Sequence, residues 1–72
     1  MPNLSERLRE IRAKHNVTQA KLSDESGIAL RSLRYYESGE RVPDGNVIIK
    51  LANYFNVSSD YLLGLSNNPE RR

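Results

Sequence analysis

Residues 18–43 read TQAKLSDESGIALRSLRYYESGERVP and contain two short amphipathic segments joined by a tight turn. Thr18 is a favourable N-cap for the first segment, because its hydroxyl can accept a hydrogen bond from a backbone N–H that lacks a partner within the helix. Gly27 can adopt the left-handed backbone conformation that most side chains resist. Leu33 and Tyr36 are three residues apart, so they share the inner face of the second segment. The pattern predicts a helix-turn-helix over about residues 18–37.

The outer face of the second helix has the chemistry needed to recognise DNA. Base edges in the major groove are contacted by side chains that project from one face of a helix, near its N-terminus. An arginine there can bind the acceptor edge of a guanine through two hydrogen bonds, and a leucine can contact the methyl group of a thymine. For each arginine the alternatives are a phosphate contact or plain solvation. We predict four base-reading residues on this face: Leu30, Arg31, Arg34 and Tyr35.

The rest of the chain shows three more helical patterns. One covers residues 4–14 after Asn3 as N-cap, another covers residues 45–55 after Asp44, and a short one follows Ser58. We therefore expect an all-α domain of five helices over residues 1–65, followed by a polar, disordered tail at 66–72. Each helix has one apolar stripe. The predicted core consists of Leu8, Ile11, Leu22, Leu33, Tyr36, Ile48, Leu51, Phe55 and Leu62.

Composition excludes several functional classes. Without cysteine and with a single histidine, the chain has no expected metal site, no cofactor and no catalytic constellation, so we do not expect an enzyme. Its longest apolar runs are three residues, which predicts a soluble, cytoplasmic protein without a membrane segment. Residues 1–41 contain eight Lys or Arg against six Asp or Glu, whereas residues 42–72 contain three of each. The positive excess therefore lies in the half that contains the helix-turn-helix.

Six pieces of the chain together resemble the Cro/cI-type (Xre, phage-repressor-like) helix-turn-helix family over roughly residues 4–65. They are LREIR at 8–12, TQAKL at 18–22, GI at 27–28, YESGERVP at 36–43, IKLANYFNVS at 49–58 and DYLLG at 60–64. The resemblance implies a lambda-repressor-like domain that binds double-stranded DNA and regulates transcription, most often as a phage or mobile-element repressor.

The resemblance also implies roles for individual residues. The base-reading positions of the family match the four residues predicted above. An arginine of the first helix commonly pairs with a glutamate that ends the third, which here are Arg12 and Glu37, and the pair is more structural than functional. Ala29 departs from the family pattern, because relatives usually have a capping Ser or Thr there. The expected contacts to the DNA backbone come from Thr18, Gln19, Ser32, Ser38 and Arg41.

One recognition helix reads only a few base pairs, so we expect a homodimer on an approximately palindromic operator. Candidates for the dimer contact are Asn56, Tyr61 and Leu65, although Tyr61 alternatively covers the edge of the core.

Two other functions stay open at this point. The segment SLRYYESG also resembles part of the MerR family, which lacks a helix like residues 4–14. A second alternative is an antitoxin-like module that binds a protein instead of DNA.

Overall fold

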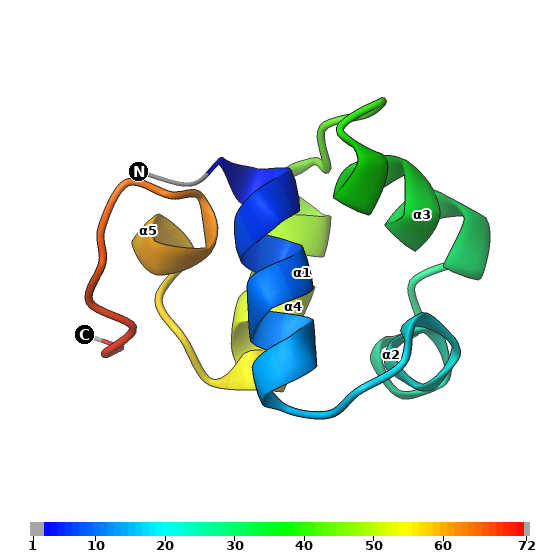
Figure 1. The fold of residues 1–72 in the computed structure, drawn as a ribbon, viewed down its shortest axis with the longest axis horizontal. Helices are drawn as coiled ribbons and strands as arrows, with labels where there is room; N and C mark the ends of the chain where they lie inside the picture. The colour runs from blue at the N-terminus through cyan, green and yellow to red at the C-terminus, as the bar shows by residue number, and fades with distance from the viewer. Residues whose placement is uncertain (1–2, 72) are drawn as a thin grey trace.

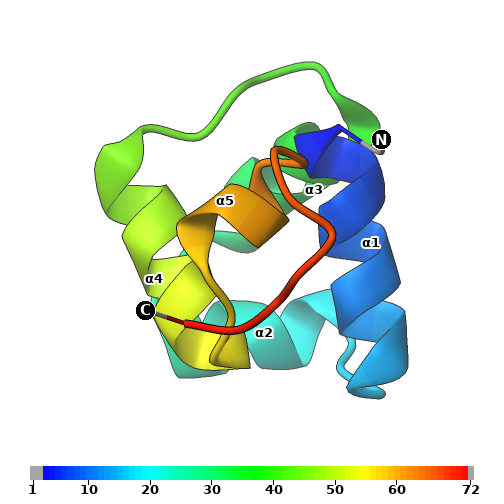
Figure 2. The same ribbon diagram turned by 90° about the vertical axis from the view of Figure 1, so that its left-hand side faces the viewer.

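The computed structural model describes residues 3–71 and contains five α-helices in that range, as the sequence predicts. They are α1 (Leu4–Lys14), α2 (Gln19–Ser26), α3 (Leu30–Ser38), α4 (Gly45–Phe55) and α5 (Ser59–Leu62). Figure 1 shows α2 and α3 on one side of α1, with α5 and the C-terminal segment on the other. Figure 2 shows the long loop that connects α3 to α4. Within residues 3–71, no helix is long and apolar enough to cross a membrane.

Local capping explains why the helices begin where they do. The side chains of Asn3, Thr18, Asp44 and Ser58 each accept a hydrogen bond from the backbone N–H three residues later. Ala29 precedes α3 and makes no such bond, because it has no polar side chain. Helix α3 therefore depends on its neighbours for the stability that the other helices obtain at their N-termini.

The turn between α2 and α3 is closed by two features. Gly27 ends α2 with a φ of 76°, a left-handed conformation that favours glycine. The hydroxyl of Ser23 donates a hydrogen bond to the carbonyl oxygen of Ile28 at 2.6 Å. Ser23 thus ties α2 to the residues that lead into α3, which fixes how closely the two helices approach.

The core lies where the five helices converge, and each helix contributes at least one buried residue. Seven of the nine predicted core residues are buried, whereas Tyr36 and Ile48 are only partly buried and pack against the edge of the core. The structure adds buried residues from the connections, which helical periodicity does not reveal. The buried apolar residues are Leu8, Ile11, Val17, Leu22, Ile28, Leu33, Leu51, Ala52, Phe55, Val57, Tyr61 and Leu62.

The C-terminal segment, residues 66–71, for which the polar composition predicts disorder, makes hydrogen bonds to the rest of the domain in the structure. The side-chain oxygen of Asn67 accepts a hydrogen bond from Arg7 at 3.1 Å. The carbonyl oxygen of Pro69 accepts from the backbone N–H of Ser58 at 3.0 Å. Arg71 donates to the carbonyl oxygen of Ala52 at 3.2 Å and to the side chain of Asn53 at 2.6 Å. The polar side chains of this segment therefore serve as hydrogen-bonding partners.

Candidate nucleic-acid interface

Helix α3 separates its inner and outer faces sharply. Leu33 and Glu37 are buried, and their direction fixes the rotation of the helix about its axis. Arg31 and Arg34 are exposed on the other face, and Leu30 and Tyr35 are half-exposed beside them. The four predicted base-reading residues therefore lie on one outward surface of a single rigid helix, which we call the α3 outer face.

The Tyr35 side chain contacts two arginines, Arg31 and Arg41. The Nε of Arg31 donates a hydrogen bond to the Tyr35 hydroxyl at 3.3 Å. The guanidinium carbon of Arg41 lies 4.5 Å from the centre of the Tyr35 ring, and that of Arg31 lies 5.7 Å from it. Cations are attracted to the face of an aromatic ring at such distances. The loop after α3 thereby places the positive charge of Arg41 next to the α3 outer face.

A buried carboxylate connects α1, α2 and α3. Glu37 is 4% exposed and accepts hydrogen bonds from Arg12 Nε at 2.7 Å and Arg12 Nη2 at 2.9 Å. The side-chain amide of Gln19 donates to the same carboxylate at 3.1 Å. The hydrogen bond from Glu37 raises the pKa of Arg12 above its ordinary value, against the opposing effect of desolvation. The ion pair that the family resemblance implies between Arg12 and Glu37 is present.

Arg9 and Arg12 contribute further contacts from α1. Arg9 Nη1 donates to the carbonyl oxygen of Glu37 at 3.1 Å, near the C-terminal end of α3. A cation is favourable there because the helix dipole is negative at that end. Arg12 Nη1 donates to the carbonyl oxygen of Val17 at 3.0 Å, just before α2. Sequence reasoning missed Arg9, although its position three residues before Arg12 places both side chains on one face of α1.

The predicted backbone-contacting residues differ in exposure and in hydrogen bonding. Thr18 is exposed and caps α2, while Gln19 is half-buried and directs its amide to Glu37. Ser32 is half-buried on α3. Ser38 is exposed, and its hydroxyl donates to the carbonyl oxygen of Tyr35 at 3.0 Å. Arg41 is exposed in the following loop.

The predicted dimer residues divide into two groups by exposure. Leu65 is 71% exposed, and Asn56 is exposed where it ends α4 in a left-handed conformation. Tyr61 is only 5% exposed, because the Arg7 guanidinium covers its ring at 4.0 Å. This corrects the prediction for Tyr61: its ring packs at the edge of the core and is not available to a second subunit.

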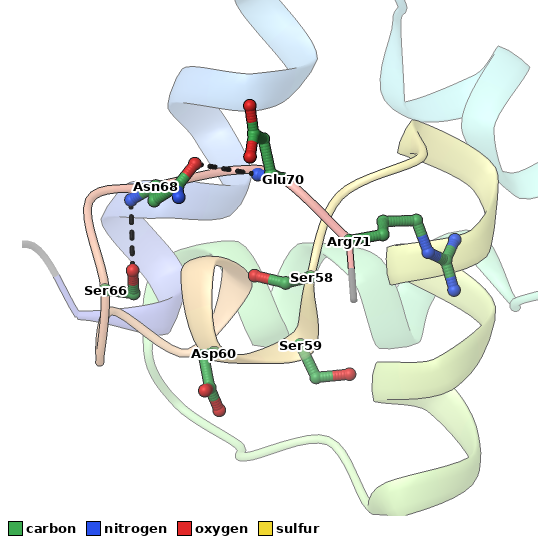
Figure 3. Close-up of a pocket in the computed structure, with 7 residues that line it drawn as sticks. All are labelled: Ser58, Ser59, Asp60, Ser66, Asn68, Glu70 and Arg71. Atoms are coloured by element: carbon green, nitrogen blue, oxygen red, sulfur yellow. Dashed lines mark hydrogen bonds between the residues drawn. The ribbon is translucent and has the colours of Figure 1, made fainter.

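A polar hollow of about 300 Å³ lies near α5 and the C-terminal segment, away from α2 and α3 (Figure 3). Asp60 and Glu70 bring negative charge to its lining, against the single positive charge of Arg71. Such a lining does not attract phosphate. Among the described residues, no group of His, Cys, Asp and Glu side chains is arranged to hold a metal ion.

Comparison with known proteins agrees with this geometry. A family model described as Helix-turn-helix matches residues 8–62. Over 62 residues the chain is 42% identical to the HTH-type transcriptional regulator ImmR of Bacillus subtilis, covering 86% of this chain and 49% of that protein. Over 61 residues it is 43% identical to the cryptic phage CTXphi transcriptional repressor RstR of Vibrio cholerae, covering 85% and 54%. The chain spans about half the length of these curated relatives.

Solved structures show the same similarity. The P22 c2 repressor protein, crystallised in complex with a synthetic operator, superposes with a TM-score of 0.83 at 29% identity, covering 92% of this chain and all of that one. A transcriptional regulator from Listeria innocua gives a TM-score of 0.78 at 32% identity, covering 86% and 58%. The fold and the family predicted from the sequence are thereby confirmed. With its two crossed helices, its buried Arg12–Glu37 pair and these relatives, the chain belongs to the helix-turn-helix family.

Proposed function

We propose that this chain is the DNA-binding part of a transcriptional regulator, a repressor of phage or prophage type, and that it has no enzymatic activity. The observation that carries the proposal is the α3 outer face, where Arg31 and Arg34 are exposed on a helix whose inner face is fixed by buried Leu33 and Glu37. The similarity to the phage repressor RstR and to the operator-bound P22 c2 repressor supports it. Because its proposed partner is DNA, we expect it to act in the cytoplasm.

In this mechanism, base recognition and positioning are separate tasks. Arg31 and Arg34 offer paired N–H donors to guanine O6 and N7, and Leu30 contacts a thymine methyl. Thr18, Gln19, Ser32, Ser38 and Arg41 contact phosphates and fix the register of α3 in the major groove. The N-terminus of α2 adds a favourable dipole for phosphate. Leu33 and Glu37 take no part in reading and keep α3 in place.

The proposed partner geometry is a homodimer on an approximate palindrome, with the two α3 helices about 34 Å apart in successive major grooves. Leu65 and Asn56 remain candidates for the contact, since both are exposed. Footprinting and analytical ultracentrifugation on a selected duplex test this arrangement. One chain per site, on a sequence without two-fold symmetry, would contradict it.

Selection of bound sequences from a random DNA pool tests the function itself. We expect enrichment of one motif, whose affinity for the chain falls steeply as salt concentration rises. A chain that enriches no sequence, or whose binding is insensitive to salt, would contradict the proposal.

A further inference from the structure

Tyr35 is the one side chain of the α3 outer face that contacts two cations, within the part of the chain that the structure describes. Its hydroxyl accepts from Arg31 Nε at 3.3 Å, and its ring lies 4.5 Å from the guanidinium of Arg41. Arg31 and Tyr35 are four residues apart, so they are neighbours on the helix surface. Tyr35 therefore bridges a predicted base-reading residue and a predicted phosphate-contacting residue.

The hydrogen bond leaves one useful edge of the Arg31 guanidinium open. With Nε engaged by Tyr35, the two terminal nitrogens Nη1 and Nη2 still present parallel N–H groups at the far end of the side chain. Guanine recognition in the major groove requires two such donors toward O6 and N7. Arg34 is also exposed, but its side chain makes no hydrogen bond or ion pair within residues 3–71. In the absence of DNA, the side chain of Arg31 is therefore held by a hydrogen bond, whereas the side chain of Arg34 is not.

The main chain at Tyr35 anchors the loop independently of the side chain. Its carbonyl oxygen accepts from the backbone N–H groups of Gly39, of Glu40 at 3.0 Å and of Arg41 at 3.4 Å. Changing the Tyr35 side chain leaves these bonds intact. A substitution of the Tyr35 side chain therefore tests its contacts with Arg31 and Arg41 without moving the loop that follows α3.

We infer that Tyr35 is a positioning residue: its hydroxyl orients Arg31 toward a guanine, and its ring holds Arg41 toward the phosphate backbone. This inference rests on the proposed function and refines it. Tyr35 does not contact a base itself; it positions Arg31 and Arg41, which contact the DNA. Orientation before binding reduces the conformational entropy that Arg31 loses when it meets the base.

Three variants separate the two contacts. Tyr35→Phe removes the hydroxyl and keeps the ring, whereas Tyr35→Leu removes both. Tyr36→Phe is the matched control, because it removes a hydroxyl from the neighbouring residue, which packs against the core edge. Binding is measured on the duplex selected by the natural chain and on its single-base-pair variants, over a range of salt concentrations. Thermal melting confirms that each variant is folded.

We expect Tyr35→Phe to reduce discrimination at the guanine read by Arg31 about three- to tenfold, the effect of losing one solvent-exposed hydrogen bond, with an unchanged salt slope. We expect Tyr35→Leu also to lower the salt slope by up to about one, as for loss of a phosphate contact. Tyr36→Phe should change neither quantity. In the Arg31→Ala background, Tyr35→Phe should have no further effect at that base pair, because the residue it orients is absent.

Two results would overturn the inference. One is a Tyr35→Phe variant that discriminates as well as the natural chain. The other is a loss at a base pair that Arg31→Ala leaves unaffected, which would make Tyr35 a reader in its own right. The NMR resonance of the Arg31 Nε–H in the free protein gives a readout without DNA, and we expect it to shift in Tyr35→Phe but not in Tyr36→Phe. If that shift occurs and no DNA sequence is preferred, the proposed function fails while the positioning geometry stands.

Discussion

Glu37 shows how one residue can determine the placement of a whole helix. Its carboxylate accepts from Arg12 and Gln19, and its carbonyl oxygen accepts from Arg9, so side chains of α1 and α2 hold the end of α3. A carboxylate that is 4% exposed is costly unless its hydrogen bonds are made. The network therefore favours one placement of α3 over alternatives of similar hydrophobic burial.

Removing the charge of Glu37 should destabilise the fold. In Glu37→Gln, Arg12 loses its counter-charge while only 23% exposed, and we expect a loss of about 2–3 kcal/mol in the free energy of unfolding by urea titration. The double variant Arg12→Met/Glu37→Met should recover much of this loss, because it removes both charges and restores apolar contact. Equal stability of the natural chain and Glu37→Gln would show that the pair contributes nothing.

The two kinds of DNA contact should respond differently to alanine substitution. Arg31→Ala should cost about 1–3 kcal/mol at one base pair and relax discrimination there. Gln19→Ala should weaken binding to every duplex about equally, because phosphates are the same in all sequences. Titration of the selected duplex and its single-base-pair variants measures both. Uniform losses for both variants would remove the case for direct base reading by Arg31.

At the scale of the helix, α3 begins less favourably than its neighbours because Ala29 provides no cap. Ala29→Ser should stabilise the chain by about 1 kcal/mol in urea unfolding, since the backbone at position 29 is already non-helical (φ −57°, ψ 137°). Ala29→Val serves as a control that changes side-chain size without supplying an acceptor. No gain for serine over alanine would mean that water already satisfies the end of α3.

Helices α2 and α4 are joined by a hydrogen bond from the Tyr54 hydroxyl to the Glu25 carboxylate, which raises the pKa of Tyr54 above its ordinary value. A raised pKa in the folded state means that this contact stabilises the fold fully below about pH 10, the ordinary value for tyrosine. The stabilisation is then lost as pH rises through the raised pKa. NMR titration should show Tyr54 ionising at lower pH in Glu25→Gln than in the natural chain. Identical titration of both proteins would contradict the contact.

Helix boundaries could be predicted from the sequence because their causes are local. Asn3, Thr18, Asp44 and Ser58 each act within three residues of their own position. The outward direction of Arg31 and Arg34 also follows from local periodicity once Leu33 is inward. The hydrogen bond between Gln19 and Glu37 could not be predicted in this way, because it depends on the angle at which α2 meets α3.

At the scale of the molecule, the contacts of the C-terminal segment with the rest of the domain could not be predicted from the sequence pattern. Arg7 and Asn67 are 60 residues apart in the chain, and only the completed fold brings them together. The Arg7 guanidinium also lies 4.0 Å from the centre of the Tyr61 ring, and both residues are almost fully buried. A short polar run has no periodicity from which such packing can be inferred.

Truncation after Leu65 tests the order of this segment. Losing the hydrogen bonds to Arg7, Ser58 and Ala52 should lower the free energy of unfolding by about 1.5–4.5 kcal/mol, since each of the three contributes roughly 0.5–1.5 kcal/mol. The Ser58 amide should exchange faster with solvent, while the Leu51 amide in the core keeps its protection. Asn67→Ala is the smaller control that removes the Arg7 bond alone. A truncated chain with unchanged stability and unchanged Ser58 exchange would instead support the disordered tail predicted from the sequence.

The division of α3 into an inner and an outer face also has an evolutionary consequence. Leu33 and Glu37 hold the helix in the fold, while Arg31 and Arg34 project away from it. Exposed positions of this kind usually change stability by less than about 0.5 kcal/mol when substituted. If α3 reads DNA as proposed, a lineage carrying this scaffold can therefore acquire a new sequence preference through these outward residues alone, while the fold is kept. Under the proposed function, a change of preferred DNA sequence then requires few substitutions and little compensation elsewhere in the chain.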